Sequence, residues 1–171
     1  MIKDFRQTLL VCSTLLRYPD EALSESLGQL SDMIDELPQK VGRLLREFLD
    51  FLKSKDWVSV QEIYVSTFDM DEECSLYLTY NTLKDDSARG VELQRLKSLY
   101  RSTGLSPTTD ELPDYLPMFL EYVGISELDA VEPVIQRYTP LVSDLALRLE
   151  KKGSPYALVV RVCADALNAL V

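Results

Sequence analysis

Apolar residues recur along most of this chain at intervals of three and four, the spacing that places side chains on one face of an α-helix. The first two runs of this kind are Phe5, Leu9, Cys12 and Leu16, followed by Leu23, Leu27, Leu30 and Ile34. Pro38 ends the second run and can begin a third, which has a wider apolar face and extends to Leu52. The pattern predicts three consecutive helices that share one core.

Side chains that cap helices mark two further elements. Asp56 precedes apolar residues spaced for a helix over 57–68, and its carboxylate can accept the free N–H groups of the first turn. Asp85 or Asp86 can begin a long helix in the same way, and Gly104 has the backbone freedom that a helix end requires. The buried side of this long helix would consist of Leu93, Leu96, Leu99 and Tyr100.

The C-terminal third is also helical in pattern, but prolines divide it. Ser126 can cap a helix that starts near Leu128, and Pro133 and Pro140 should interrupt or bend this helix because each removes a backbone donor. Residues 153–155, Gly-Ser-Pro, would end it, with the proline at the first position of a last helix. That last helix is apolar on most of its surface and should run through the core; its apolar residues are Val159, Val162, Cys163, Ala166 and Leu170.

The segment between the two capped helices has two interpretations. Its densest acidic run, residues 69–73, lacks the glycine and the ligand spacing of a calcium loop. We expect this run to begin a helix that carries Cys74, Tyr77 and Leu78, because carboxylates are favourable near the positive end of a helix dipole. A strand over 75–80 is the alternative, since Leu-Tyr-Leu-Thr-Tyr is rich in strand formers. No neighbouring segment is an evident partner for a strand, so helix is preferred.

Two prolines four residues apart stand at the start of the apolar run 111–123. Pro113 suits a first helical turn, but Pro117 would crowd the carbonyl of Pro113 in the same helix. We therefore expect a turn near 112–116 and a helix from about Pro117. Asp114 and Tyr115 would lie on this kink, either as a lip that binds a peptide or, in a plain helix start, with the phenol ring packed in the core.

The composition is that of an ordinary soluble globular protein. It has 171 residues, of which 46% are hydrophobic and 27% charged, and this length supports a sizeable core. No run approaches the roughly 20 apolar residues of a membrane-spanning helix, and residues 9–16 fit a first core helix better than a signal peptide. We expect one all-α domain over residues 1–171, a bundle of about eight helices without stable membrane insertion.

Charge and chemistry exclude several functional classes. A net charge of −10 argues against a nucleic-acid surface and favours a basic partner. The chain has no histidine, which removes the commonest general base and the commonest metal ligand. Cys12, Cys74 and Cys163 have no metal-binding spacing and fit buried, reduced thiols of a cytoplasmic protein. We expect no enzyme activity, no metal site and no cofactor.

A binding function fits the residues better, because tyrosine offers a large amphipathic contact area at low entropic cost. Five of the nine tyrosines cluster in the central region: Tyr64, Tyr77, Tyr80, Tyr115 and Tyr122. Acidic side chains around a groove rich in tyrosine and leucine would complement an amphipathic helix that carries Lys or Arg. For any single one of these tyrosines, a structural role is equally consistent with the sequence, in which the side chain packs between helices in the core.

Several ordered motifs resemble those of the NarJ-type nitrate reductase molybdenum-cofactor assembly chaperones, which belong with the TorD-like redox-enzyme maturation chaperones. They are residues 15–19 (Leu-Leu-Arg-Tyr-Pro), 64–69 (Tyr-Val-Ser-Thr-Phe-Asp), 75–80 (Ser-Leu-Tyr-Leu-Thr-Tyr), Arg89-Gly90 with Leu93, Arg95-Leu96 and Tyr100, and 112–117 (Leu-Pro-Asp-Tyr-Leu-Pro) with Leu120-Glu121. The resemblance implies an all-helical TorD-like fold and a cytoplasmic protein without catalytic activity.

The resemblance also implies a partner, the N-terminal segment of the catalytic subunit of a membrane-bound molybdoenzyme. Such a chaperone holds the apo subunit until the molybdenum bis-guanine-dinucleotide cofactor and an iron–sulfur cluster are installed, and it is absent from the mature complex. The partner-binding residues carried over are Tyr64, Phe68, Asp69, Tyr77, Tyr80, Arg95, Asp114, Tyr115 and Glu121. The aromatic rings would make apolar contacts, and Asp114 and Glu121 would engage basic or N–H groups. Arg95 can instead pair with a buried carboxylate.

The alternative is a stable helical adaptor, or a TorD-type chaperone that binds the twin-arginine signal peptide of another redox enzyme.

Overall fold

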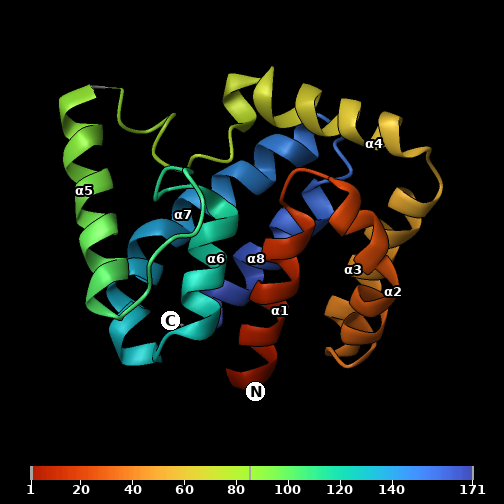
Figure 1. Cartoon of the computed structure of the whole chain (residues 1–171), viewed down its shortest axis with the longest axis horizontal. Helices are drawn as coiled ribbons and strands as arrows, with labels where there is room; N and C mark the ends of the chain where they lie inside the picture. The colour runs from red at the N-terminus through yellow and green to blue at the C-terminus, as the bar shows by residue number, and fades with distance from the viewer. Residues whose placement is uncertain (1, 85, 171) are drawn as a thin grey trace.

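The computed structural model describes residues 2–84 and 86–170, and it confirms the all-α prediction (Figure 1). The α-helices are α1 (Ile2–Leu15), α2 (Glu21–Asp35), α3 (Gln39–Lys53), α4 (Trp57–Tyr64), α5 (Asp86–Ser102), α6 (Leu116–Ile125), α7 (Leu128–Lys151) and α8 (Ala157–Asn168). A π-helical turn, η1 (Val65–Asp69), continues α4, and a short 3-10 helix, η2 (Glu72–Cys74), follows it.

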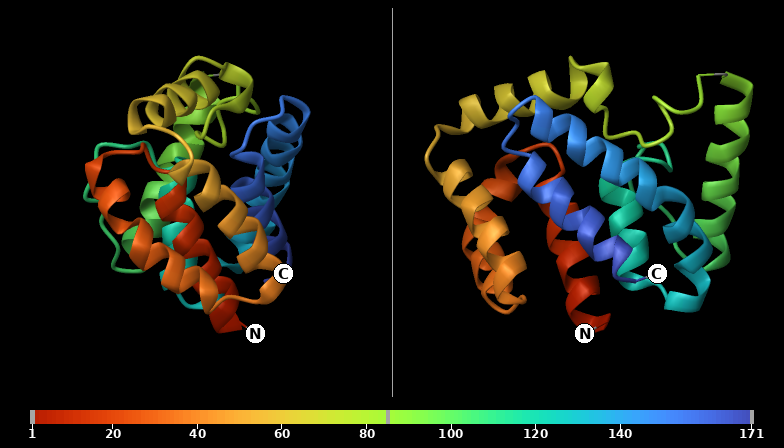
Figure 2. Two further views of the ribbon diagram at one scale, coloured as in Figure 1. Left: turned by 90° about the vertical axis from the view of Figure 1, so that its right-hand side faces the viewer. Right: turned by 180° about the vertical axis from the view of Figure 1, so that it is seen from behind.

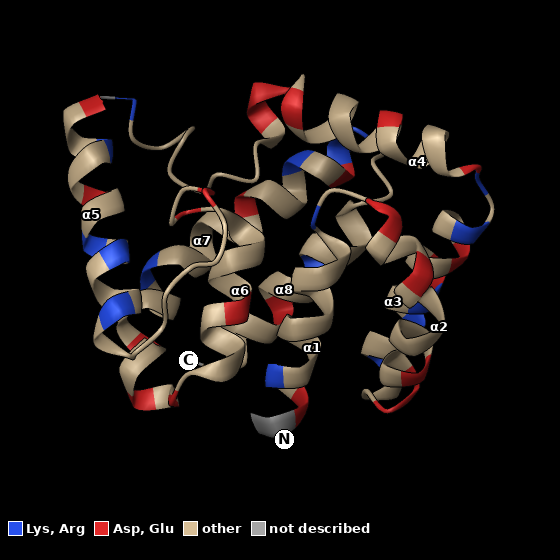
Figure 3. Ribbon diagram, viewed as in Figure 1, with Lys and Arg blue, Asp and Glu red and all other residues tan. Residues whose placement is uncertain are grey.

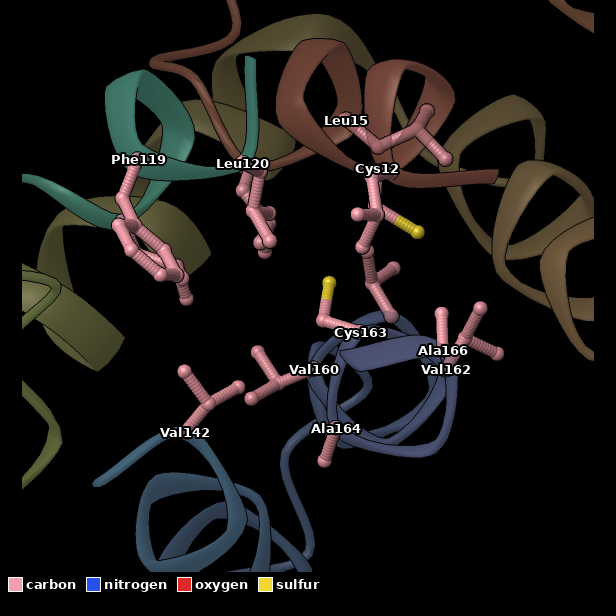
Figure 4. Packing of buried hydrophobic residues seen from close by; sticks show 14 of the residues in the cluster. Cys12, Leu15, Phe119, Leu120, Val142, Val160, Val162, Cys163, Ala164 and Ala166 are labelled. Atoms are coloured by element: carbon pink, nitrogen blue, oxygen red, sulfur yellow. The ribbon is translucent and has the colours of Figure 1, made fainter. Parts of the chain in front are cut away.

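Helix α8 lies at the centre of the core, as the sequence predicts. It packs against α1, α3 and α7, and Val159, Val160 and Cys163 are fully buried. Figure 4 shows Val160 and Cys163 of α8 in the space bounded by Cys12 of α1, Phe119 and Leu120 of α6, and Val142 of α7. Seen from behind, α7 and α8 run side by side (Figure 2). The helix begins at Ala157, two residues later than expected.

Helices α1 and α6 form a close antiparallel pair. Ser13 donates its hydroxyl to the carbonyl oxygen of Pro117 at 2.7 Å, and at the other end Arg6 donates to the carbonyl oxygen of Ser126 at 2.7 Å. Gly124 lies directly against Leu10, so close that a Cβ atom in its place would lie 2.8 Å from the Leu10 Cδ2 atom. This pairing positions the start of α6, where the two prolines stand.

The expected caps are mostly present. Asp56 accepts the N–H of Ser59 at 3.0 Å and begins α4, while Gly104 (φ +79°) follows the end of α5. Helix α5 begins at Asp86; the alternative cap, Asp85, lies outside the described residues. Of the expected buried side of α5, Leu96 and Tyr100 are buried and Leu93 and Leu99 are half-buried.

Two details of the C-terminal third differ from expectation. Of the two effects expected of Pro133 and Pro140, an interruption does not occur, and α7 runs without a break over 24 residues because its apolar face is buried before, between and after them. Ser126 does not cap α7 either. Its backbone N–H donates to the carbonyl oxygen of Tyr122, so it ends α6 instead, and Glu127 precedes α7 without a side-chain cap.

The segment 75–80 is not helical, contrary to the prediction. After η2 the chain turns, and Tyr77 forms an isolated antiparallel β-bridge with Tyr115. Within residues 2–84 and 86–170, no helix combines the length and the hydropathy needed to cross a bilayer. The same residues contain no group of three or more thiol and carboxylate side chains arranged to hold a metal ion.

Candidate functional site

The site begins with the pairing of two segments that lie far apart in the sequence. The N–H of Leu78 donates to the carbonyl oxygen of Asp114 at 3.0 Å, and the N–H of Leu116 donates to the carbonyl oxygen of Leu76 at 2.8 Å. These bonds flank the Tyr77–Tyr115 bridge. The segment 75–80 is therefore closer to the strand alternative than to the preferred helix. The turn at 112–116 provides the pairing partner that the sequence did not reveal.

Asp114 holds this pairing from inside the protein. Its side chain is fully buried, and one carboxylate oxygen accepts both the N–H and the hydroxyl of Thr79, at 3.0 and 2.6 Å. Arg89 of α5 lies 3.5 Å from the same oxygen. The buried carboxylate holds the turn at 112–116 in place, and the direct contact expected between Asp114 and a partner stays a prediction.

Three tyrosines are in contact at the bridge. The ring of Tyr77 lies 5.5 Å from that of Tyr115, and the hydroxyl of Tyr115 lies 3.2 Å from that of Tyr64. Tyr64 donates its own proton to the carbonyl oxygen of Leu16, so Tyr115 is the donor between the two hydroxyls. Tyr64 is only 4% exposed, whereas Tyr77 and Tyr115 are half-buried. Tyr64 therefore ties helices together, and the other two rings reach the surface.

Burial keeps these phenols protonated. It raises the pKa of Tyr64 and of Tyr115, and it raises the pKa of Tyr77 together with a hydrogen bond to Glu111. At neutral pH the three hydroxyls are hydrogen-bond donors and not nucleophiles. The pKa of Asp69 is also raised, first by desolvation and then by the charge of Glu111. Asp69 is exposed on η1 and is close enough to Glu111 for the two negative charges to repel each other.

A cleft of about 350 Å³ opens next to Tyr115. The link between α1 and α2, the loop after α5 and the exposed side of α6 form its walls. Its apolar lining includes Tyr18, Leu105, Pro107, Tyr115, Met118 and Ile125, and its charged lining consists of Arg17, Asp20, Glu111 and Glu121. Three carboxylates and one guanidinium give this cleft a negative rim over an apolar floor. Such a surface fits a segment that presents apolar side chains together with a positive charge.

Two of the predicted site residues, Tyr115 and Glu121, line this cleft, and Tyr64 and Tyr77 support Tyr115 from the side. The sequence reasoning missed Tyr18, which is 46% exposed and packs edge-on against Tyr64. It also missed a stripe along α6. Residues 115, 118, 122 and 125 are Tyr, Met, Tyr and Ile, all in the cleft, and their helical spacing was a signal that could have revealed it.

The other predicted residues lie elsewhere. Phe68 is buried against Tyr64 and Tyr156, and Tyr80 is partly exposed under the guanidinium of Arg89, 5.5 Å from the ring centre. Arg95 pairs with Glu92 at 3.1 Å, and Glu92 is buried, as the structural alternative for this arginine predicts. None of these three side chains lines the cleft.

The buried carboxylate of Glu92 fastens α5 to α7. Arg137 donates to both of its oxygens at 2.9 Å, and the hydroxyl of Tyr138 donates to one of them. Burial alone would raise the pKa of Glu92, but the bonds from Tyr138 and Arg137 and the nearby charges outweigh it and lower the pKa. Figure 3 shows that Lys and Arg gather on α5, whereas carboxylates dominate the turn after α4.

Known proteins resemble this chain over most of its length. The family described as nitrate reductase delta subunit matches residues 34–160. The probable nitrate reductase molybdenum cofactor assembly chaperone NarJ of Bacillus subtilis (strain 168) is 36% identical over 166 residues, which cover 96% of this chain and 90% of that protein. The nitrate reductase molybdenum cofactor assembly chaperone NarJ of Escherichia coli (strain K12) is 30% identical over 167 residues, covering 95% and 70%.

A third relative is a larger protein. The nitrate reductase-like protein NarX of Mycobacterium tuberculosis (strain CDC 1551 / Oshkosh) is 32% identical over 152 residues. These residues cover 88% of this chain and 23% of that relative.

Proposed function

The chain belongs to the nitrate reductase delta subunit family, to its NarJ-type members, and we propose that it is an assembly chaperone for a nitrate reductase or a related membrane-bound molybdoenzyme. The two NarJ relatives are named as assembly chaperones. In this proposal the chain binds the N-terminal segment of the apo catalytic subunit in the cytoplasm. It leaves before the mature complex is complete.

One observation carries the proposal beyond the family: the cleft beside Tyr115 has an apolar floor and an acidic rim. Its volume of about 350 Å³ lies at the small end of the range for ligand pockets, so it would hold the anchoring side chains of a segment and not a folded domain. Tyr18 and Ile125 extend the apolar surface outward, since each remains about half exposed. An amphipathic segment with Lys or Arg near its apolar face matches this arrangement.

The chaperone would act by selective binding. It would stabilise the conformation of the apo subunit in which the cofactor cleft is open, and cofactor insertion would then create contacts that release it. A binding protein can shift such an equilibrium only by the difference between its affinities for the two states. Modest affinity for the segment therefore suits release.

Calorimetry of the purified protein against the N-terminal peptide of a nitrate reductase catalytic subunit tests this proposal. Met118→Ala on the floor of the cleft should weaken saturable binding, because hot-spot side chains of an interface lie in such desolvated pockets. Leu147→Ala is the matched control, since Leu147 is 57% exposed on α7 and does not line the cleft. Equal effects of the two substitutions, or no saturable binding by the unaltered protein, would argue against this site.

The acidic rim also suits the alternative partner, a twin-arginine signal peptide of another redox enzyme. Titration with such a peptide distinguishes the two, because the proposal expects the catalytic-subunit peptide to bind more tightly. Stoichiometric presence of the chain in the purified mature enzyme would favour a stable adaptor.

A further inference from the structure

The three carboxylates of the cleft differ in what they bind within the protein. Asp20 accepts the N–H of Leu23 at 2.9 Å as the N-cap of α2, and Glu111 accepts the hydroxyl of Tyr77. Neither of these bonds brings a positive charge to the rim. Glu121 differs, because a guanidinium is its partner.

Arg17 provides that guanidinium. Its Nη2 atom donates to Glu121 Oε2 at 2.6 Å, and both side chains line the cleft. The two residues are 104 positions apart in the sequence, and their side chains are 52% and 48% exposed. Arg17 thus supplies from within the chain the group that a basic client segment would bring to Glu121.

The backbone around Arg17 allows its side chain to leave without disturbing the fold. Arg17 lies in the non-helical link between α1 and α2. This link is anchored two residues later, where Trp57 and Gln61 donate to the carbonyl oxygen of Pro19 at 3.0 and 2.9 Å. The guanidinium itself makes no other hydrogen bond among the described residues. It can therefore exchange places with an incoming cation.

We propose that Arg17 is an internal competitor that occupies Glu121 in the free protein and is displaced by a Lys or Arg side chain of the client segment. This inference rests on the proposed function, because it assumes that a peptide segment enters the cleft. In this inference Glu121 is the residue that recognises the positive charge of the client segment. Arg17 is the residue that lowers the affinity of the cleft for that segment. Because Arg17 can pair with Glu121 again when the client leaves, the exchange favours release.

The size of the effect follows from the exposure of the pair. An exposed ion pair shifts an equilibrium by only about two- to five-fold. When a competitor keeps a site occupied for part of the time, the apparent affinity for a ligand falls by the same fraction. Removal of Arg17 should therefore strengthen the binding of a cationic segment by about two- to five-fold, an effect that salt reduces.

The experiment compares two probes by calorimetry at low and at high salt. One probe is the N-terminal peptide of the nitrate reductase catalytic subunit, and the other is the same peptide with every Lys and Arg replaced by Gln. The Arg17→Ala variant should bind the native peptide more tightly than wild type does, and its affinity for the Gln peptide should be unchanged. The Glu121→Gln variant should have a lower affinity for the native peptide only. In the double variant, the gain from Arg17→Ala should disappear.

Arg46→Ala is the matched control, because it removes the same charge from another exposed ion pair, with Asp35 of α2, outside the cleft. Thermal unfolding of each variant checks that the fold is intact. The inference is wrong if Arg17→Ala binds no tighter than wild type, if both peptides respond equally, or if Arg46→Ala gives the same gain. If the unaltered protein binds neither peptide, the proposed function itself fails.

Discussion

Thr79 gives both its backbone N–H and its hydroxyl to a single oxygen of Asp114, at 3.0 and 2.6 Å. Thirty-five residues separate the two in sequence. These two hydrogen bonds hold the turn at 112–116 against the segment that carries Tyr77, and so they position Tyr115 beside the cleft. The aspartate that the motif places at a binding lip therefore acts one layer below the surface.

Asp114→Ala should destabilise the protein strongly. The substitution leaves the N–H and the hydroxyl of Thr79 buried without an acceptor, and each such group costs about 1–3 kcal/mol. We expect the free energy of unfolding, measured in urea, to fall by about 2–4 kcal/mol. The loss is smaller than the full sum for two unpaired groups because water can enter part of the space that the truncated side chain leaves. Glu121→Ala is the control on the exposed rim, and it should cost at most about 1 kcal/mol. Equal losses from the two would show that the buried bonds do not hold the segment.

Local signals in the sequence were sufficient for most of the fold. The periodic apolar residues of α1, α2 and α3, the cap at Asp56 and the glycine after α5 depend on residues near in sequence, and the structure has them as predicted. The error at 75–80 is of another kind. Whether Leu-Tyr-Leu-Thr-Tyr becomes helical depends on a partner 38 residues away, Tyr115, and a periodicity argument cannot see that partner.

The same distinction explains the candidate site. The motif pointed to Tyr115 and Glu121, which do line the cleft, but it could not separate Tyr115 from Asp114, its buried neighbour in sequence. The two residues differ in burial because the side chain of Asp114 faces inward from the turn and that of Tyr115 faces outward. Tyr18 and Glu111 were missed because they come from a link and a loop that only the tertiary structure brings to α6.

The hydroxyl and the ring of Tyr115 should be separable by substitution. Tyr115→Phe removes the 3.2 Å bond to Tyr64, which still donates to Leu16, so the free energy of unfolding should fall by about 0.5–1.5 kcal/mol. Client-peptide affinity should stay within about twofold, since the ring remains in the cleft. Tyr115→Ala removes the ring, and as a hot-spot truncation it should weaken binding more than tenfold. Calorimetry that found the two variants equally weak would assign recognition to the hydroxyl.

Acid should weaken the protein through Glu92. The folded-state pKa of this carboxyl is lowered, so the unfolded chain binds a proton more readily. The stability that Glu92 contributes is therefore complete above its unfolded pKa of about 4.3 and is lost as pH falls through the lower folded value. Glu92→Gln should cost about 1.5–3 kcal/mol at pH 7, because hydrogen bonds to a charged group are lost.

Urea unfolding between about pH 3 and pH 7 checks this, because the acid limb of the Glu92→Gln variant should be flatter than that of wild type. Glu47→Gln removes the same charge from the exposed face of α3 and serves as the control. Parallel pH profiles for wild type and Glu92→Gln would contradict the assignment.

Two glycines inside helices should respond to alanine with opposite signs. A Cβ at Gly28 in α2 would meet nothing within 4 Å, so Gly28→Ala should raise the free energy of unfolding by about 0.5–1 kcal/mol. At Gly124 the Cβ would lie 2.9 Å from Leu10 Cγ and 3.4 Å from the carbonyl oxygen of Arg6, so Gly124→Ala should lower it by about 1–3 kcal/mol. Thermal or urea unfolding measures both.

A double-mutant cycle tests whether the cost at Gly124 arises from the contact with Leu10. Leu10→Ala removes the two side-chain atoms that the new methyl group would meet. In the Leu10→Ala background, Gly124→Ala should therefore cost less than in wild type, and the cycle should be non-additive. Because α1 and α6 together position Arg17 and Glu121 at the cleft, the same clash should also weaken client binding. Additive energies, or unchanged binding, would mean that the spacing of the two helices does not depend on this glycine.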